Sequence, residues 1–192
     1  MLHKIFNMTQ SGRSDKKRNE LFNYLGLGEY QNKYKDTHIY QYSPLDEYFI
    51  IGLIDGDGSF YVTFQSNKLI NFGFQITQSR SDVELLLRVK AYFNCGEIAY
   101  EKGTNIAKYR VLGIHDLHTY IIPFADKYPL YTLKKFQYMA FKKALEIYMK
   151  NPILSDENRK LIIDLVYNIY MNGEKRKMTK EEYLATYFPN HS

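Results

Sequence analysis

The pattern of apolar residues changes abruptly at Gly58, and this change constrains the fold more than any other feature of the chain. Before it, Ser43 and Pro44 suit the start of a helix, and the run Tyr48–Ile54 is apolar on nearly every side. Such a run predicts a helix buried on two sides, because a surface helix shows a single apolar stripe. After Gly58, apolar and polar residues alternate, which is typical of a half-exposed strand.

The same periodicities extend along the rest of the chain. They predict strands at 60–65 and 71–77 with a turn at 66–68, and further strands at 97–101 and 107–113. They predict helices at 82–93, 116–126, 132–150, 155–170 and 179–187, with Pro123 limiting the second of these. The order indicates an α+β fold with four antiparallel strands flanked by helices. We expect three parts: a polar N-terminal extension at 1–43, a core at 44–150, and a C-terminal helical extension of the same domain at 151–192.

Composition excludes several classes of protein. The chain has 192 residues, of which 45% are hydrophobic, so it can bury a core without crosslinks. Its one cysteine, Cys95, excludes an internal disulfide framework and a zinc site with several cysteines. The sequence holds no apolar stretch long enough to span a membrane, so we expect no membrane partner. The net charge of +5 is compatible with a polyanionic partner.

The segment Ile50–Phe60 carries the most chemical information. Gly52 and Gly56 lie four residues apart, on one face of the expected helix, where they permit close approach of another helix. Asp55 and Asp57 follow at its C-terminal end, where the helix dipole disfavours an anion by about 0.3–1 kcal/mol. A recruited cation would explain this placement, because carboxylate and carbonyl oxygens are the ligands that Mg²⁺ prefers. A polar helix-to-strand turn explains the same residues without a metal.

This segment, Ile-Ile-Gly-Leu-Ile-Asp-Gly-Asp-Gly-Ser-Phe, resembles the signature of the LAGLIDADG homing endonucleases. The resemblance covers roughly residues 45–150 and includes Phe74–Gln78 and Tyr128–Thr132. It implies that family's fold, a four-stranded antiparallel saddle sheet in the order αββαββα, here with extra C-terminal helices. One motif per chain implies a homodimer with a two-fold contact. The implied interface comprises Ile51, Gly52, Asp55 and Gly56.

The resemblance also implies the roles of catalytic residues. Asp57 would bind a divalent metal ion, with Mg²⁺ as the expected ion, beside the carbonyl of Gly56. Two such carboxylates would hold metal ions between the scissile phosphates, with water as the nucleophile. Gln78 would help to order the water, and Lys134, or its neighbour Lys135, would stabilise charge near the phosphate. Arg80 would be a further basic catalytic residue.

Strand parity predicts a nucleic-acid-binding face. If Phe60, Val62 and Phe64 face the core, the alternate residues of the four strands face outward. Polar and basic side chains on one sheet face suit base edges and phosphates in a major groove. The predicted DNA-binding residues are Tyr61, Thr63, Gln65, Asn71, Gln75, Tyr100, Lys102, Lys108 and Arg110, with Gly73 on the same surface.

These features predict a site-specific, metal-dependent endonuclease, encoded in an intron, that cuts double-stranded DNA at a long near-palindromic site as a homodimer. One alternative is an RNA-binding splicing cofactor (maturase) for a group I intron; another is a structural subunit that keeps the fold without cleavage. Lys, Asn, Tyr, Ile and Phe, which share A/T-rich codons, make up 80 of the 192 residues. This bias suggests a mitochondrial or other organelle gene.

Overall fold

The computed structural model describes residues 45–65, 69–151, 153–167, 169 and 177–188. The chain divides after Ser43 into two units, and every element below belongs to the second, Pro44–Ser192. The predicted extension at 1–43 and the predicted turn at 66–68 lie outside the described residues. Within the described residues, no helix is long and apolar enough to cross a membrane.

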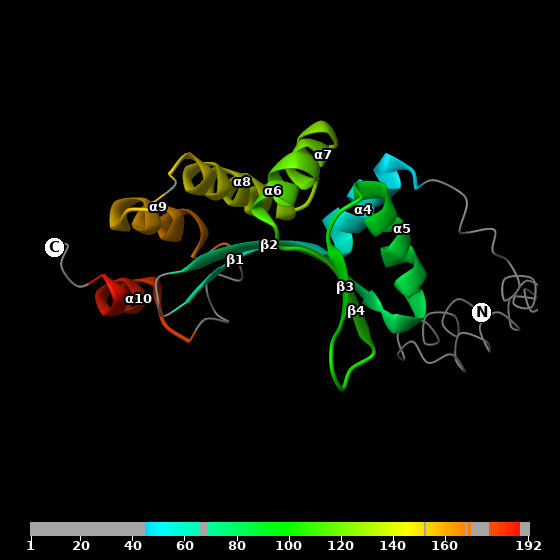
Figure 1. Ribbon diagram of the computed structural model, residues 1–192, viewed down its shortest axis with the longest axis horizontal. Coiled ribbons are helices and arrows are strands. Elements are labelled where there is room, and N and C mark those ends of the chain that lie inside the picture. The colour runs from blue at the N-terminus through cyan, green and yellow to red at the C-terminus, as the bar shows by residue number, and fades with distance from the viewer. Residues whose placement is uncertain (1–44, 66–68, 152, 168, 170–176, 189–192) are drawn as a thin grey trace, which may run out of the picture. The chain divides into compact units, whose positions relative to one another are not determined.

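Four antiparallel strands form a single arched sheet, shown in Figure 1. The strands are β1 (Gly58–Phe64), β2 (Ile70–Ser79), β3 (Glu97–Tyr100) and β4 (Ile106–Val111), and their spatial order is β1-β2-β4-β3. Alternation sends every second residue to one face, and those residues are buried, among them Phe60, Phe74, Ile76, Ala107 and Tyr109. The predicted α+β fold with four antiparallel strands is confirmed.

Helices cover this buried face of the sheet (Figure 1). They are α4 (Glu47–Asp57), α5 (Val83–Phe93), α6 (Ile114–Asp116), the π-helical turn η3 (Leu117–Ile121), α7 (Ile122–Lys127) and α8 (Lys134–Lys150), with the short 3₁₀ turn η2 (Arg80–Asp82) before α5. The opposite face, which we call the open face, carries the alternate strand residues, including Tyr61, Thr63, Asn71 and Gln75.

The first described helix, α4, differs from its prediction in where it starts and in how many of its sides are buried. Its N-cap is Asp46, whose carboxylate accepts from the backbone amides of Tyr48 and Phe49, so the helix starts later than Ser43 and Pro44 predicted. Only one side of α4, the side with Ile50 and Ile54, is buried within the chain. The predicted second buried side is exposed in the single chain.

Pro123 does not shorten its helix as predicted. It lies at the first turn of α7, directly after η3. A proline in a helix cannot donate and clashes with the carbonyl four residues earlier. The wider π-helical turn ahead of it, with its i→i+5 bonds, lets the helical path run on from α6 into α7.

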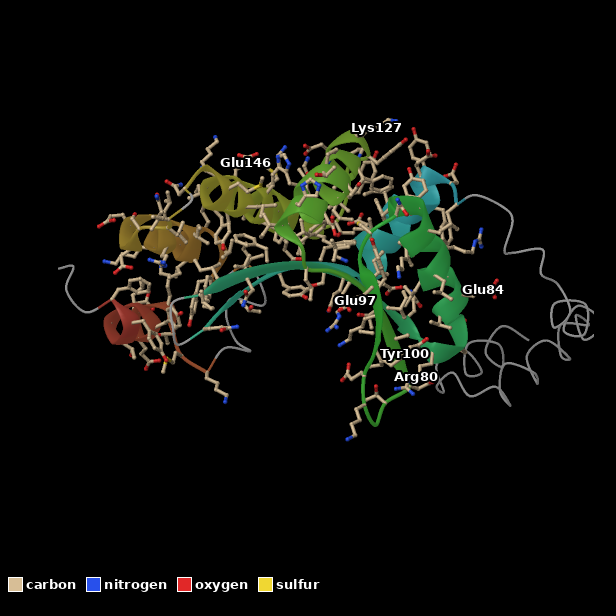
Figure 2. The ribbon with its side chains drawn as sticks, in the orientation of Figure 1. Arg80, Glu84, Glu97, Tyr100, Lys127 and Glu146 are labelled. Atoms are coloured by element: carbon tan, nitrogen blue, oxygen red, sulfur yellow. The ribbon has the colours of Figure 1, made fainter. Side chains whose placement is uncertain are left out.

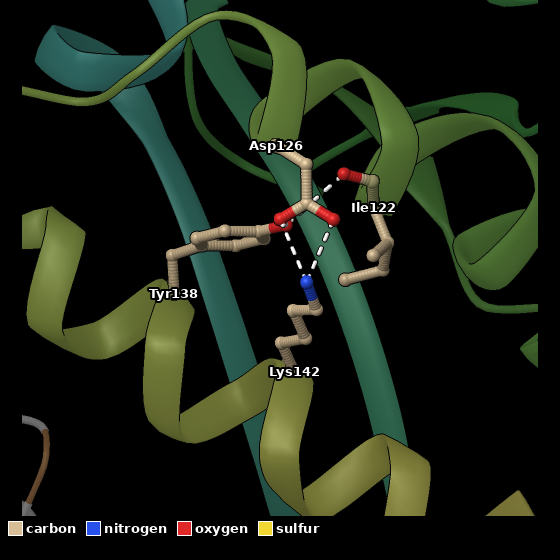
Figure 3. Close-up of polar contacts among 4 residues, drawn as sticks. All are labelled: Ile122, Asp126, Tyr138 and Lys142. Carbon is tan, nitrogen blue, oxygen red and sulfur yellow. Dashed lines mark hydrogen bonds and ion pairs between the residues drawn. The ribbon is translucent and has the colours of Figure 1, made fainter.

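A polar network fastens α7 to α8 (Figure 3). The Tyr138 hydroxyl lies 2.6 Å from an Asp126 oxygen and 3.0 Å from the Ile122 carbonyl, and Lys142 contacts both Asp126 oxygens. Burial raises the pKa of the Asp126 carboxyl, but the bonds from Lys142 and Tyr138 outweigh it, and the pKa lies below its ordinary value. Burial raises the pKa of Tyr138 well above its ordinary value, so the hydroxyl stays a donor.

The last helices, α9 (Asp156–Val166) and α10 (Lys180–Tyr187), build a small second core at the end of β1. Phe64 stacks on Tyr167 and contacts the ring of Tyr183, whose hydroxyl donates to the Gln65 carbonyl over 3.0 Å. A capping box formed by Thr179 and Glu182 starts α10. These contacts tie the C-terminal helices to the end of the sheet.

Candidate active site

The C-terminal end of α4 is joined to the start of α8. The Asp55 carboxylate accepts from the backbone amides of Tyr131 and Thr132 and from the Thr132 hydroxyl, the last over 2.6 Å. Burial raises the pKa of Asp55, but these bonds and the charge of Lys134 outweigh it, so the pKa lies below its ordinary value. Asp55 therefore anchors the end of the helix to the segment that precedes α8.

Lys134 supplies the cation that the acids at the helix end require. Its Nζ donates to the carbonyls of Ile54 (2.9 Å), Asp55 (2.9 Å) and Gly56 (3.1 Å). A lysine there satisfies carbonyls that a helix end leaves free and offsets the negative end of the dipole. Burial lowers the pKa of Lys134, and the charges of Asp55 and Asp57 offset this only in part. The neighbouring Lys135 is exposed.

Asp57 is the exposed carboxylate of this site. Gln78, near the end of β2, donates through Nε2 to Asp57 Oδ2 over 2.6 Å. Gln78 lies on the helix side of the sheet because it is paired with the buried Ala107. The next residue, Gly58, must be glycine, since a Cβ there would lie 2.6 Å from the Ile54 carbonyl oxygen. The structure thus brings Asp57, Gln78 and Lys134 together at one point.

Arg80 lies elsewhere. Its guanidinium donates to the Glu101 carbonyl over 2.8 Å and rests over the ring of Tyr100, 5.4 Å from the ring centroid. Figure 2 shows Arg80 and Tyr100 together at the end of the β3–β4 hairpin. In the single chain, η2 thus turns the Arg80 side chain toward the loop between β3 and β4, and its catalytic role stays a prediction.

The open face holds most of the predicted DNA-binding residues. Thr63, Gln65 and Asn71 are exposed, Tyr61 and Gln75 are half-buried, and Lys102 lies exposed in the loop between β3 and β4. Gly73 is covered by the Tyr61 ring, which occupies the space that a Cβ would need. The predicted position of Tyr100 on the open face is corrected by the strand register. Tyr100 pairs with the buried Ala107, so its side chain is on the helix side of the sheet, where it is exposed.

Two acidic residues on the open face were missed. Glu97 contacts Arg110 and Glu101 contacts Lys108, each over 2.7 Å. Glu97 and Arg110 are directly paired across β3 and β4. Opposite charges at facing positions of a predicted hairpin are a recognisable signal, and they would have identified the first pair.

A different surface lies on the exposed side of α4. Tyr48, Phe49, Gly52 and Gly56 are exposed, and nothing lies within 4 Å of a Cβ built on either glycine. Ile51, in contrast, is only 6% exposed and packs in the chain's own core. The helix thus turns Ile51 toward the core together with Ile50 and Ile54, and its place in a subunit interface stays a prediction.

The oxygen atoms of this site determine how it could bind a metal ion. Across the described parts of the chain, no group of three or more His, Cys, Asp or Glu side chains gathers where it could hold a metal. Asp57 offers exposed, hard oxygen atoms that suit Mg²⁺, whereas the Gly56 carbonyl already accepts from Lys134. The donor set fits a divalent ion provided that further oxygen ligands come from a substrate or a second chain.

The family model of the LAGLIDADG endonucleases matches residues 50–145, half of the chain. The chain belongs to the LAGLIDADG endonuclease family. The matched range starts in α4 and ends in α8, so it includes Asp57, Gln78 and Lys134.

Two fungal relatives are 32% identical to this LAGLIDADG protein. One is an "Uncharacterized 50.9 kDa protein in ND4 intron 1" of Podospora anserina, aligned over 60% of this chain and 27% of its own. The other is a "Probable intron-encoded endonuclease 2" of Neurospora crassa, aligned over 61% of this chain and 26% of its own. The chain thus spans about a quarter of the length of these relatives.

Solved LAGLIDADG structures share the fold. The meganuclease I-SmaMI, in a structure bound to uncleaved DNA with calcium ions, matches with a TM-score of 0.65 and 30% identity, over 76% of this chain and 49% of its own. The homing endonuclease I-TnaI matches with a TM-score of 0.62 and 21% identity, over 75% of this chain and 97% of its own, which is a likeness of fold alone.

Proposed function

We propose that this chain is one half of a site-specific DNA endonuclease that hydrolyses phosphodiester bonds with a divalent metal ion. The observation that carries the proposal is the exposed Asp57 carboxylate, held by Gln78 and placed beside the Lys134 ammonium at the end of α4. Half of the chain matches a family of endonucleases, and an I-SmaMI structure with a similar fold is described as bound to DNA with calcium ions.

Asp57 is the proposed metal ligand, with Mg²⁺ as the expected ion. A bound divalent ion would stabilise the attacking and leaving oxygens of the phosphate. Within the chain, Gln78 orients the Asp57 carboxylate through its amide. Lys134 holds the helix end in place and keeps a positive charge next to the site, where a scissile phosphate would gain from it.

The complete site is proposed to need two copies of this chain. One chain contributes a single exposed carboxylate at α4, whereas two-metal hydrolysis needs ligands on both sides of the scissile phosphates. The face of α4 with Gly52 and Gly56 is open and flanked by Tyr48 and Phe49, so two such helices could pack closely. A two-fold contact there would bring two Asp57 residues together.

The open face of the sheet is the proposed DNA-binding surface. Its polar residues lie in register across the strands, and a two-fold pair of such sheets would follow the major groove of a near-palindromic site. The proposed contacts are Tyr61, Thr63, Gln65, Asn71, Gln75, Lys102, Lys108 and Arg110. Intron-encoded relatives and the excess of residue types with A/T-rich codons support an organelle intron as the origin of the gene.

The test is cleavage of the intronless junction of the host gene by purified protein in Mg²⁺. We expect a double-strand break at one site, with no break from Asp57→Asn, which keeps the side-chain shape but removes the charge. DNA binding by Asp57→Asn in Ca²⁺ should persist. Full cleavage by this variant would overturn the proposed metal ligand. Binding of intron RNA without any binding of duplex DNA would support the splicing cofactor instead.

A further inference from the structure

The two cations of β4 on the open face, Lys108 and Arg110, are each paired with a carboxylate. Arg110 Nη2 lies 2.7 Å from Glu97 Oε1, and Lys108 Nζ lies 2.7 Å from Glu101 Oε2. All four side chains are partly exposed. Figure 2 shows Glu97 on the side of the sheet opposite α8 and its residue Glu146. Each cation therefore has a carboxylate partner before any ligand arrives.

A carboxylate on this surface affects which part of a duplex can approach it. Phosphates would be repelled by Glu97 and Glu101, so the two cations are poorly suited to simple neutralisation of the DNA backbone. Base edges in the major groove present both acceptors and donors. A surface with paired donors and acceptors is complementary to base edges rather than to phosphates.

The geometry of the Glu97–Arg110 pair favours one base pair. In the major groove a guanine presents two acceptors, N7 and O6, and its cytosine partner presents one donor, the N4 amino group. The bond between the two side chains uses one guanidinium nitrogen and one carboxylate oxygen, so the guanidinium keeps further donors and the carboxylate further acceptors. Two donors next to one acceptor complement the edge of a G·C pair.

We infer that Glu97 and Arg110 act as one unit that reads a G·C base pair in the major groove. Arg110 donates to guanine, and Glu97 both orients the guanidinium and accepts from the cytosine amino group. This inference rests on the proposed DNA-binding function and adds Glu97 as a specificity-determining residue.

The position of the pair within the sheet supports this role. Ser59, Gln75, Arg110 and Glu97 lie in register in one row across all four strands. Arg110 therefore lies on the inner strand β4, between Gln75 of β2 and Glu97, which begins the edge strand β3. Gln75, directly opposite Arg110, adds an amide that can read a neighbouring base.

The test is a base-preference profile in Ca²⁺. Duplexes that bind the wild-type protein are selected from a randomised pool, and each position is then replaced by the other three base pairs. We expect one position in each half-site at which G·C is preferred by roughly 5- to 150-fold, the range for a good bidentate contact. Both Glu97→Gln and Arg110→Lys should reduce this preference at least fivefold, at the same position of each half-site and at no other.

Glu146→Gln is the matched control, because it removes the same charge from the exposed surface of α8 on the other side of the sheet. It should leave the profile unchanged. The salt dependence gives a second readout: if Glu97→Gln frees Arg110 to neutralise a phosphate, the slope of log K against log salt should steepen by about 0.9 for each bound chain.

The inference is overturned if Glu97→Gln changes affinity for all sequences equally, or matches the control, while the wild type binds duplex DNA selectively. Failure of the wild type to bind any duplex would instead overturn the proposed function. Thermal unfolding of each variant distinguishes a loss of base preference from a loss of folding.

Discussion

The ammonium of Lys134 lies 2.9 Å from the carbonyl oxygen of Asp55, a residue 79 positions earlier in the chain. The same ammonium binds the carbonyls on either side, so the end of α4 is capped by a side chain from α8. Two acids can therefore stand at the negative end of a helix dipole without a bound metal. This cap leaves Asp57 exposed for a ligand while Asp55 is used within the chain.

Replacing Lys134 by methionine should destabilise the protein. The change removes three hydrogen bonds from a charged donor and leaves the carbonyls in a partly buried site. We expect the free energy of unfolding in urea to fall by about 1–3 kcal/mol. Lys135→Met is the matched control, because that side chain is exposed, and it should change stability by about 0.5 kcal/mol or less. Equal effects of the two variants would contradict the capping role.

Stability should fall in acid because of Asp55 and Asp126. The pKa of each carboxyl is below its ordinary value of 3.8 in the folded chain, so the unfolded chain binds protons first as the pH falls. The two carboxylates contribute their full stabilisation at pH values above the unfolded pKa of 3.8. This stabilisation is lost as the pH drops through the lower pKa of the folded chain. Asp55→Asn should reduce stability at neutral pH and weaken this acid dependence.

The measurement is urea unfolding at a series of pH values. Asp164→Asn serves as the control, since Asp164 forms an exposed ion pair with Lys180 that should contribute about 1 kcal/mol or less. An acid dependence in Asp55→Asn that is as steep as in the wild type would show that this carboxyl is not a source of it.

Replacing Gly52 by leucine should separate folding from assembly. Nothing lies within 4 Å of a Cβ at Gly52, so the single chain can accept the side chain, and helix propensity should improve by roughly 1 kcal/mol. If two copies pack through this face, the leucine forces the helices apart. Sedimentation should then show monomer where the wild type is dimeric.

Ala185→Leu is the control for the added apolar surface, because Ala185 is exposed on α10. It should leave the sedimentation of the wild type unchanged. A wild type that is monomeric at micromolar concentration, or a Gly52→Leu dimer, would overturn the proposed two-fold contact.

Gly73→Ala should move the Tyr61 ring and little else. The new Cβ would lie 2.3 Å from Tyr61 Cζ, near the far end of a side chain that can rotate away. We expect a loss of stability below about 1 kcal/mol but a change in DNA affinity, because Tyr61 belongs to the proposed binding face. Tyr61→Ala combined with Gly73→Ala should bind DNA as Tyr61→Ala alone does, and a further loss in the double variant would contradict this coupling.

The amino-acid sequence by itself determined the order of the elements, the motif and the two faces of most strands. The change of period at Gly58 marks the junction of α4 and β1, and the buried Phe60, Phe74 and Ile76 lie where alternation predicts them. These features depend on local geometry, which repeats every two or 3.6 residues and can be read without knowledge of distant contacts.

Only the tertiary structure decided which side chains meet. Lys134 was predicted to act on phosphate, but its cap on α4 depends on how α8 packs beside that helix. The helix-side position of Tyr100 follows from its pairing with Ala107, and the contacts of Arg80 follow from the turn at η2. In each case the partner is more than twenty residues away or on another strand, and the three-dimensional packing of elements, which local periodicity does not encode, sets the contact.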